Sequence, residues 1–317
     1  MDEAQIAAIV EAVVRELTAA AGPAAVRAVP APPAPPAEVL APPAAPLAAA
    51  GSAPSELIID LPDPTTPDQR YRPGVRNPRD PEALRALVAS TTARIGVGRA
   101  GPRYRTASLL LFQADHAITQ DALYRDVDPK LLDELGLFSV QTKITGGKQE
   151  YLLRPDLGRQ ISEEGKRLIQ EKCARAPQIQ LVVGDGLSAA AVEANAREMF
   201  PVIRQGAQAA GLTFGTPFFI KYCRVGVLND IGDLLQPEVV ILLIGERPGL
   251  GRAESLSAYM AYRPKAGDSD ANRDVICNIF NNGGTNPLEG AAFAVQTAQK
   301  MIRYQASGVK LKQAAGG

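Results

Sequence analysis

The chain has 317 residues, of which 46% are hydrophobic, so it can bury a substantial core in one large or two small domains. Lys plus Arg and Asp plus Glu number 34 each, so no net charge attracts the chain to nucleic acid or to an anionic membrane. No apolar run approaches the roughly 20 residues of a membrane helix, and no apolar secretory segment follows the acidic N-terminus. We therefore expect a cytoplasmic protein that binds neither nucleic acid nor membrane.

The residues with reactive side chains are few and scattered. Cys173, Cys223 and Cys277 are far apart and follow no metal-binding spacing, so we expect buried, reduced thiols. The single histidine, His116, excludes a zinc site built from several imidazoles and leaves one possible Ser–His pairing.

The N-terminal segment divides into a helix and a spacer. Residues 1–20 place six aliphatic side chains at helical spacing, which predicts an amphipathic helix. Residues 21–58 are nearly all Ala and Pro, which predicts a disordered, extended linker. We expect the tethered helix to dock on another protein; the alternative is a helix that packs on its own domain.

Residues 59–155 are expected to form a smaller, mostly helical region. Helical patterns cover 80–91 and 106–127, the second with a possible break near Ala117. Alternating residues over 137–154, with Gly146-Gly147 between them, predict a hairpin.

Residues 156–317 alternate between apolar strands and helices. Strands are expected over 179–186, 216–223 and 238–245. Helices are expected over 158–176, 189–211, 230–235 and 287–308, with a long polar loop before the last of them. This order predicts an α/β fold with a doubly wound, mainly parallel sheet that is flanked by helices.

Polar residues follow each of the three predicted strands, as Asp185-Gly186 with Ser188, Arg224-Val225 and Glu246-Arg247. The carboxyl ends of parallel strands meet at one edge of a sheet, where ligands bind in α/β proteins. The three segments together therefore predict a binding crevice, although each alone is more typical of a turn with solvated charges.

Gly96, Gly98 and Gly101 have the spacing G-x-G-x-x-G, which in a dinucleotide-binding protein follows an apolar strand and opens a helix. Here only "TTARI" precedes Gly96, and Pro102 follows Gly101. We therefore interpret the segment as a loop that presents Arg99, Arg103 and Arg105.

Seven phrases of the chain are distinctive: they are "GRAGPRYRT" (98–106), "LLLFQADHAITQD" (109–121), "YLLRPDLGR" (151–159), "VVGDGLSAAAV" (182–192), "GTPFFIKYCRV" (215–225), "VILLIGERPGLGRAESLSAY" (240–259) and "ASGVKL" (306–311). In the same order, and over about residue 93 to the end, they resemble the small subunit of ethanolamine ammonia-lyase. Residues 1–20 resemble the segments that target enzymes to bacterial microcompartments.

The resemblance implies an adenosylcobalamin-dependent radical enzyme that converts ethanolamine to acetaldehyde and ammonia. It implies a large subunit, a TIM barrel, that holds the substrate, with this chain covering the cobalamin at the interface between them. It also implies an assembly of six copies of each subunit, a chain that is inactive alone and has no catalytic residue of its own, and a location inside a microcompartment.

The cobalamin contacts of the family carry over to Val225 in "CRV", Glu246 in "GERPG" and Val275 in "NRDVICNI", and Arg224 and Arg247 flank two of them. Cys277 is the alternative to Val275 for the third contact. The signature D-x-H-x-x-G is missing because Asp115 and His116 are adjacent. We therefore expect base-on cobalamin, a structural role for His116, and no direct metal ligand in this chain.

Two other functions are compatible with parts of the sequence. The glycine spacing and the α/β pattern are compatible with an independent nucleotide-binding oxidoreductase. The N-terminal helix and its linker are compatible with a microcompartment adaptor that has no cofactor role. If the chain is instead a small subunit of ethanolamine ammonia-lyase, we expect the loop with Arg99, Arg103 and Arg105 to meet the large subunit or to lie near the edge of the cofactor.

Overall fold

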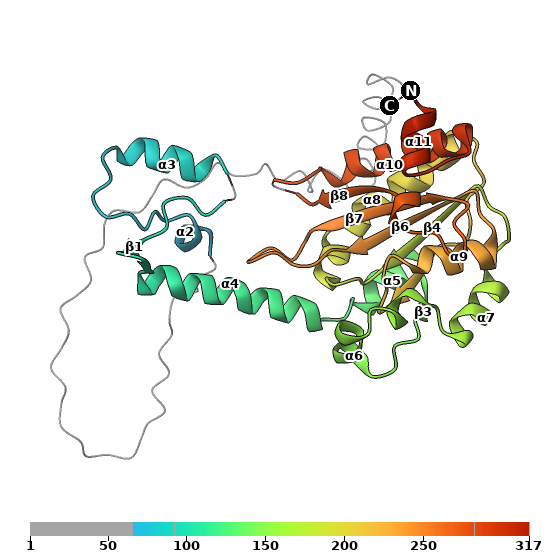
Figure 1. Ribbon diagram of the computed structural model, residues 1–317, viewed down its shortest axis with the longest axis horizontal. Coiled ribbons are helices and arrows are strands. Elements are labelled where there is room, and N and C mark those ends of the chain that lie inside the picture. The colour runs from blue at the N-terminus through green and yellow to red at the C-terminus, as the bar shows by residue number, and fades with distance from the viewer. Residues whose placement is uncertain (1–65, 92, 282, 317) are drawn as a thin grey trace, which may run out of the picture. The chain divides into compact units, whose positions relative to one another are not determined.

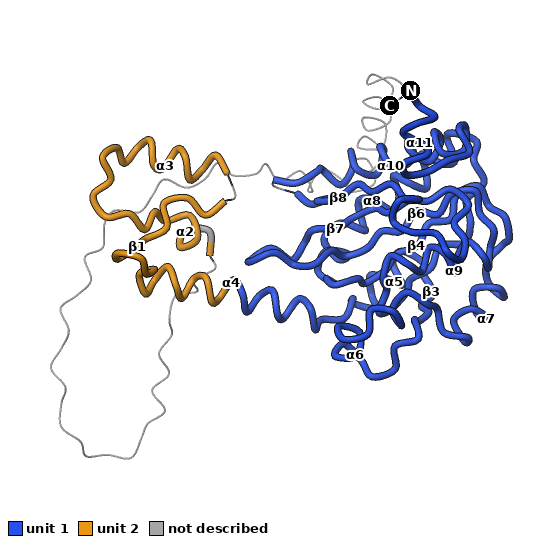
Figure 2. Tube along the Cα trace, viewed as in Figure 1, with its two compact units in different colours: residues 1–21, 115–317 blue, residues 22–114 orange. Residues whose placement is uncertain are grey.

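The computed structural model describes residues 66–91, 93–281 and 283–316. The predicted helix over 1–20 and linker over 21–58 lie outside these ranges. The described residues divide into two compact units, with the boundary between Ala114 and Asp115 (Figure 2). This boundary lies about 40 residues before the expected start of the sheet domain at 156.

The smaller unit contains two short helices, a hairpin and the start of a longer helix. Their bounds are α2 (Pro67–Arg70), α3 (Pro81–Ala89), β1 (Arg99–Ala100), β2 (Arg103–Tyr104) and α4 (Thr106–Tyr124). The Asp80 carboxylate caps α3 by accepting the N–H groups of Glu82 and Ala83 at 3.1 and 3.0 Å. The helix predicted over 80–91 is thus confirmed, and α4 continues through Ala117 without a break.

The arginine-rich segment is a tight antiparallel hairpin rather than an open loop. Arg99 pairs with Tyr104, and Gly101 takes a φ of +60° in the turn between the two strands. The Arg99 guanidinium lies 4.6 Å from the centre of the Tyr104 ring, and Arg105 Nε donates to the Arg99 carbonyl at 3.1 Å. Arg99 and Arg103 are exposed, whereas Arg105 is half-buried by this packing.

In the described part of the larger unit, six strands form one sheet in the order β3-β5-β4-β6-β7-β8 (Figure 1). The strands are β3 (Phe138–Gln141), β4 (Ile179–Gly184), β5 (Phe218–Lys221), β6 (Val239–Gly245), β7 (Leu256–Tyr262) and β8 (Asp274–Ile279). The first four in this order are parallel, and β7 and β8 are antiparallel to their neighbours. The α/β class is confirmed, with a mixed sheet.

Helices cover both faces of this sheet, as a doubly wound fold requires. They are α5 (Pro129–Leu135), α6 (Gly147–Leu153), α7 (Glu163–Lys172), α8 (Ala189–Ala209), α9 (Val227–Leu235), α10 (Pro287–Tyr304) and α11 (Val309–Ala314), with 3-10 turns at Leu157–Arg159 and Asp270–Asn272. One core contains side chains of α5, α8, α10 and α11, and the other contains side chains of α7 and α9. Every residue of β4 and β6 is buried between these layers.

The prediction of a hairpin over 137–154 is wrong. Phe138 pairs in parallel with Phe218 of β5, and their rings lie 5.4 Å apart. The segment after Gly146 forms α6 instead of a returning strand. The partner of β3 lies 80 residues away in sequence, so local alternation identified a strand but not the strand with which it pairs.

The prediction of a long polar loop after residue 245 is also partly wrong. It contains β7 and β8, which extend the parallel sheet by two antiparallel strands. β8 lies at the edge of the sheet, and five of its six residues are half-buried or exposed, while a bulge interrupts its pairing with β7. An edge strand of this kind lacks the continuous apolar run by which β4 and β6 are recognised.

Candidate functional site

The carboxyl ends of β4 and β5 are joined by one buried carboxylate. Asp185, directly after β4, accepts the backbone N–H of Tyr222 at 2.9 Å and of Cys223 at 2.8 Å. Tyr222 has a φ of +58°, which is an unfavourable conformation for a non-glycine residue. The Asp185 carboxylate therefore holds β5 at the point where the chain turns toward Arg224 and Val225.

Lys148 of α6 completes this junction and was not identified from the sequence. Its ammonium lies 3.2 Å from the Asp185 carboxylate, and the two side chains are 8% and 2% exposed. It also lies 5.6 and 5.5 Å from the ring centres of Tyr151 and Tyr222. Burial raises the pKa of the Asp185 carboxyl, and the Lys148 ammonium and the two N–H groups act in the opposite direction.

Arg224 and Val225 lie immediately beyond this junction. The Arg224 guanidinium lies 4.3 Å from the centre of the Tyr151 ring, and its Nη2 donates to the Tyr151 carbonyl at 3.2 Å. Its buried Nε has no hydrogen-bond partner among the described residues. Val225 is half-buried, packs against the core that α7 and α9 share, and precedes α9 by two residues.

The ends of β4 and β6 approach each other through backbone. The Leu187 N–H donates to the Gly245 carbonyl at 2.9 Å, and Ser188 caps α8 while donating to the Ala253 carbonyl. Gly186 has a φ of +57°, and a Cβ there would lie 2.1 Å from the Gly245 oxygen. Asp185, Gly186 and Ser188 are thus buried in internal contacts, so the expectation that they present hydrogen-bonding groups to a ligand is wrong.

Glu246 lies directly after β6 on the α9 side of the sheet. Its backbone N–H donates to the Ser255 carbonyl at 3.0 Å, and its Oε1 accepts from the Tyr259 hydroxyl at 3.3 Å. The loop that follows is tied to α4, because the Thr119 hydroxyl donates to the Gly249 carbonyl at 2.9 Å. Arg247 is exposed to solvent.

Val275 lies on the same face of the sheet as Glu246. It is directly opposite Tyr259, which is in turn opposite Leu242 of the buried strand β6. Val275 is 48% exposed although it lies next to this core. Arg273, two residues earlier, donates to the Asn229 side chain of α9 at 3.2 Å. The segment before β8 is therefore fastened to the helix that follows Val225.

These contacts define the candidate site as the α9-side surface formed by Val225, Glu246, Tyr259 and Val275. Val225 and Tyr259 pack against the same core, and Tyr259 connects Glu246 with Val275. Tyr259 could have been suspected from "SAY", but only the strand pairing brings it to the site. Cys277 lies further along β8, in the segment where the pairing with β7 is bulged, so Val275 is the residue in register with Tyr259.

Three other expectations can be compared with the structure. Cys173 and Cys223 are buried as expected, but Cys277 is exposed on the edge strand, so that part of the expectation is wrong. His116 is exposed on α4. Within the described ranges, no group of three His, Cys, Asp or Glu side chains is arranged to hold a metal ion.

The glycine motif lacks the context of a dinucleotide site. Among the residues that the structure describes, no strand immediately precedes Gly96, and Gly101 is the turn of the β1–β2 hairpin. The helix that follows, α4, begins only at Thr106. A separate finding concerns membranes: no helix in the described part of the chain has the length and apolar composition needed to span one.

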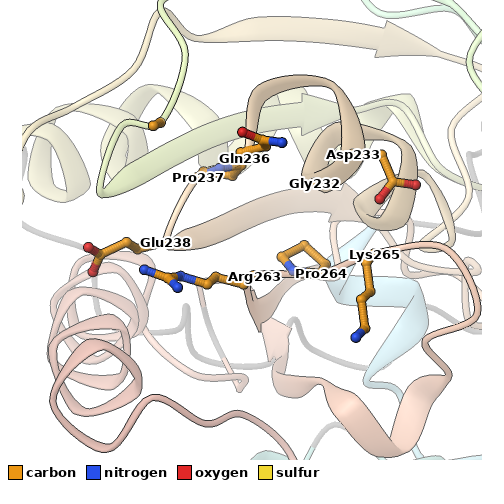
Figure 3. A pocket seen from close by; sticks show the side chains of 9 residues that line it. Gly232, Asp233, Gln236, Pro237, Glu238, Arg263, Pro264 and Lys265 are labelled. Atoms are coloured by element: carbon orange, nitrogen blue, oxygen red, sulfur yellow. The ribbon is translucent and has the colours of Figure 1, made fainter.

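A hollow of about 520 Å³ lies beside the amino end of β6 and the carboxyl end of β7 (Figure 3). It is bordered by Glu238, which precedes β6, by Arg263, which follows β7, and by Asp233 and Lys265. These side chains carry both signs of charge and surround the amino end of β6. The hollow is therefore separate from Glu246, which lies at the other end of β6.

Comparison with known proteins shows the family. The profile of the family described as Ethanolamine ammonia-lyase light chain (EutC) matches residues 81–312. The ethanolamine ammonia-lyase small subunit of Clostridium perfringens is 45% identical over 252 residues, which is 80% of this chain and 85% of that protein. Those of Clostridioides difficile and Listeria innocua are 43% and 41% identical, over 81% and 82% of this chain and 89% and 91% of their own lengths. The chain therefore belongs to the family of ethanolamine ammonia-lyase small subunits, components of a carbon–nitrogen lyase.

Proposed function

We propose that the α9-side surface binds adenosylcobalamin and covers it at the interface with the large subunit. One observation carries this proposal: of the three positions expected to contact cobalamin, Glu246 and Val275 meet at Tyr259, and Val225 packs against the same core as Tyr259. Arg224, next to Val225 in the chain, is half-buried, and Arg247 is exposed beside Glu246.

The chemistry of these residues suits a corrin ring. Corrin side chains end in neutral amides, which both donate and accept hydrogen bonds. The Glu246 carboxylate can accept from an amide N–H, and the Arg224 Nε is a donor whose acceptor the described chain does not supply. Val275 adds exposed apolar surface on which the edge of a corrin can pack.

The proposed role of this chain is to bind and orient adenosylcobalamin and to shield it from water. The Lys148–Asp185 junction holds the turn that presents Arg224 and Val225, and the Thr119–Gly249 contact holds the loop after Glu246. Adenosylcobalamin, bound base-on, would supply the radical chemistry that converts ethanolamine to acetaldehyde and ammonia. The residues of this chain would exclude water from that reaction, and none of them would accept a proton or form a covalent bond.

The partner implied by this role is the large subunit, a barrel enzyme expected to hold ethanolamine, in an assembly of six copies of each chain. The β1–β2 hairpin provides exposed Arg99 and Arg103 as candidates for contact with that subunit. We further propose a cytoplasmic location inside a microcompartment, reached through residues 1–20.

The central experiment is co-expression with the large subunit, followed by purification and measurement of the cobalamin absorption spectrum. We expect activity only in the presence of both chains and the cofactor. Deamination of ethanolamine by this chain alone would contradict the proposed division of roles.

The contact of Glu246 is tested by equilibrium dialysis of cobalamin with the complex. Glu246→Ala should weaken binding, because the corrin amide loses the carboxylate that accepts its hydrogen bond. Glu238→Ala is the matched control, since Glu238 stands at the other end of the same strand. Equal affinities for the two variants would remove Glu246 from the site.

A truncated chain that lacks residues 1–58 separates the enzyme from the adaptor interpretation. The enzyme interpretation expects retained activity in the complex and loss of encapsulation. Complete loss of function, with normal assembly of the two subunits, would favour the adaptor. Unchanged encapsulation would contradict the targeting role of residues 1–20.

A further inference from the structure

Tyr259 connects two residues of the candidate site without having been expected there. Its hydroxyl donates to Glu246 Oε1 at 3.3 Å, and its backbone is directly opposite Val275. Its ring packs against the core that α7 and α9 share. Tyr259 is thus fixed by the sheet, whereas Glu246 begins a loop.

The environment of Tyr259 determines which group donates in the hydrogen bond between Tyr259 and Glu246. Burial, followed by the charge of Glu246, raises the pKa of the Tyr259 phenol to about 12. The phenol therefore remains protonated at neutral pH and acts as the donor, while the carboxylate accepts. A carboxylate has two oxygens, so the Oε1 contact leaves Oε2 for a second donor.

We propose that Tyr259 is a positioning residue of the cobalamin site: it holds the Glu246 carboxylate in place so that the second oxygen can accept from a corrin amide. This inference rests on the proposed function. A glutamate side chain that is held before binding loses less rotamer freedom when the ligand arrives, which increases affinity. Without the phenol, Glu246 could still reach the ligand, but only at the cost of that freedom.

The test is a double-mutant cycle on the complex with the large subunit, with hydroxocobalamin as the probe in equilibrium dialysis. The variants are Tyr259→Phe, Glu246→Ala and the two combined. Tyr259→Phe should weaken binding about 3-fold to 10-fold, the range of one net hydrogen bond. In the Glu246→Ala background the same change should have almost no effect, because no carboxylate remains to be held.

The control is Tyr262→Phe, on the same strand but opposite Val239 and packed against the other core. It should leave hydroxocobalamin affinity unchanged. Thermal unfolding of each variant accompanies the binding measurement, because a residue that only stabilises the fold would lower the melting temperature without coupling to Glu246.

The outcomes separate this inference from the proposed function. If Glu246→Ala weakens binding and Tyr259→Phe has no effect, or the same effect in both backgrounds, the positioning role is overturned and the site stands. If Glu246→Ala leaves affinity unchanged, the contact itself and the positioning role are both overturned.

Discussion

Lys148 and Asp185 form a buried ion pair, 3.2 Å apart, between α6 and the end of β4. The pair stands behind the turn that presents Arg224 and Val225, because Asp185 also accepts the N–H groups of Tyr222 and Cys223. A buried pair of this kind adds little net stability compared with apolar residues, but the loss of one partner leaves an uncompensated charge.

Lys148→Met should therefore lower the free energy of unfolding by about 3–5 kcal/mol, as urea denaturation would measure. Lys166→Met removes the lysine of a surface pair in which Lys166 is 28% and Glu163 80% exposed, and it should be nearly neutral. Similar losses in the two variants would show that burial of the Lys148–Asp185 pair has no energetic consequence.

Gly186→Ala should destabilise the chain by about 2–5 kcal/mol, the sum of left-handed backbone strain and overpacking. A Cβ at this position would lie 2.1 Å from the Gly245 oxygen. Gly136→Ala is the control: Gly136 has a φ of +65°, but a Cβ there meets nothing within 4 Å. Urea denaturation should therefore show the strain alone, about 1–2 kcal/mol, for Gly136→Ala.

Alkylation with iodoacetamide at pH 8 should modify Cys277 first. Cys277 is exposed on β8, whereas burial raises the pKa of Cys173 to about 11 and the pKa of Cys223 also lies well above its ordinary value. Because the thiolate is the reactive form, the two buried thiols should react slowly until the chain unfolds. Peptide mass spectrometry would locate the label, and Cys277→Ser should remove the fast phase. Early modification of Cys223 would contradict the packing at the end of β5.

Arg103→Glu should impair association with the large subunit, because Arg103 is exposed on the β1–β2 hairpin and the charge is reversed there. Gel filtration of the co-expressed subunits would measure the loss of complex. Arg167→Glu makes the same charge change on the exposed side of α7 and should leave the complex intact. A normal elution profile for Arg103→Glu would remove the hairpin from the interface.

The predictions from sequence succeeded where a local pattern carries the information. β4 and β6 were found because strands buried on both faces are continuous apolar runs. The hairpin over 137–154 failed because β3 takes a partner 80 residues away. β8 was missed because its edge position lets polar and exposed residues interrupt the strand pattern.

The sequence by itself determined the α/β class, the main parallel strands and the family, and it identified Val225, Glu246 and Val275 as candidate contacts. Only the tertiary structure decided that Asp185 is a buried junction rather than a ligand group, that Lys148 neutralises it, and that Tyr259 connects Glu246 with Val275. The reason is physical: helix and strand patterns depend on near neighbours in the chain, whereas buried charge pairs and cross-strand contacts depend on residues that folding brings together.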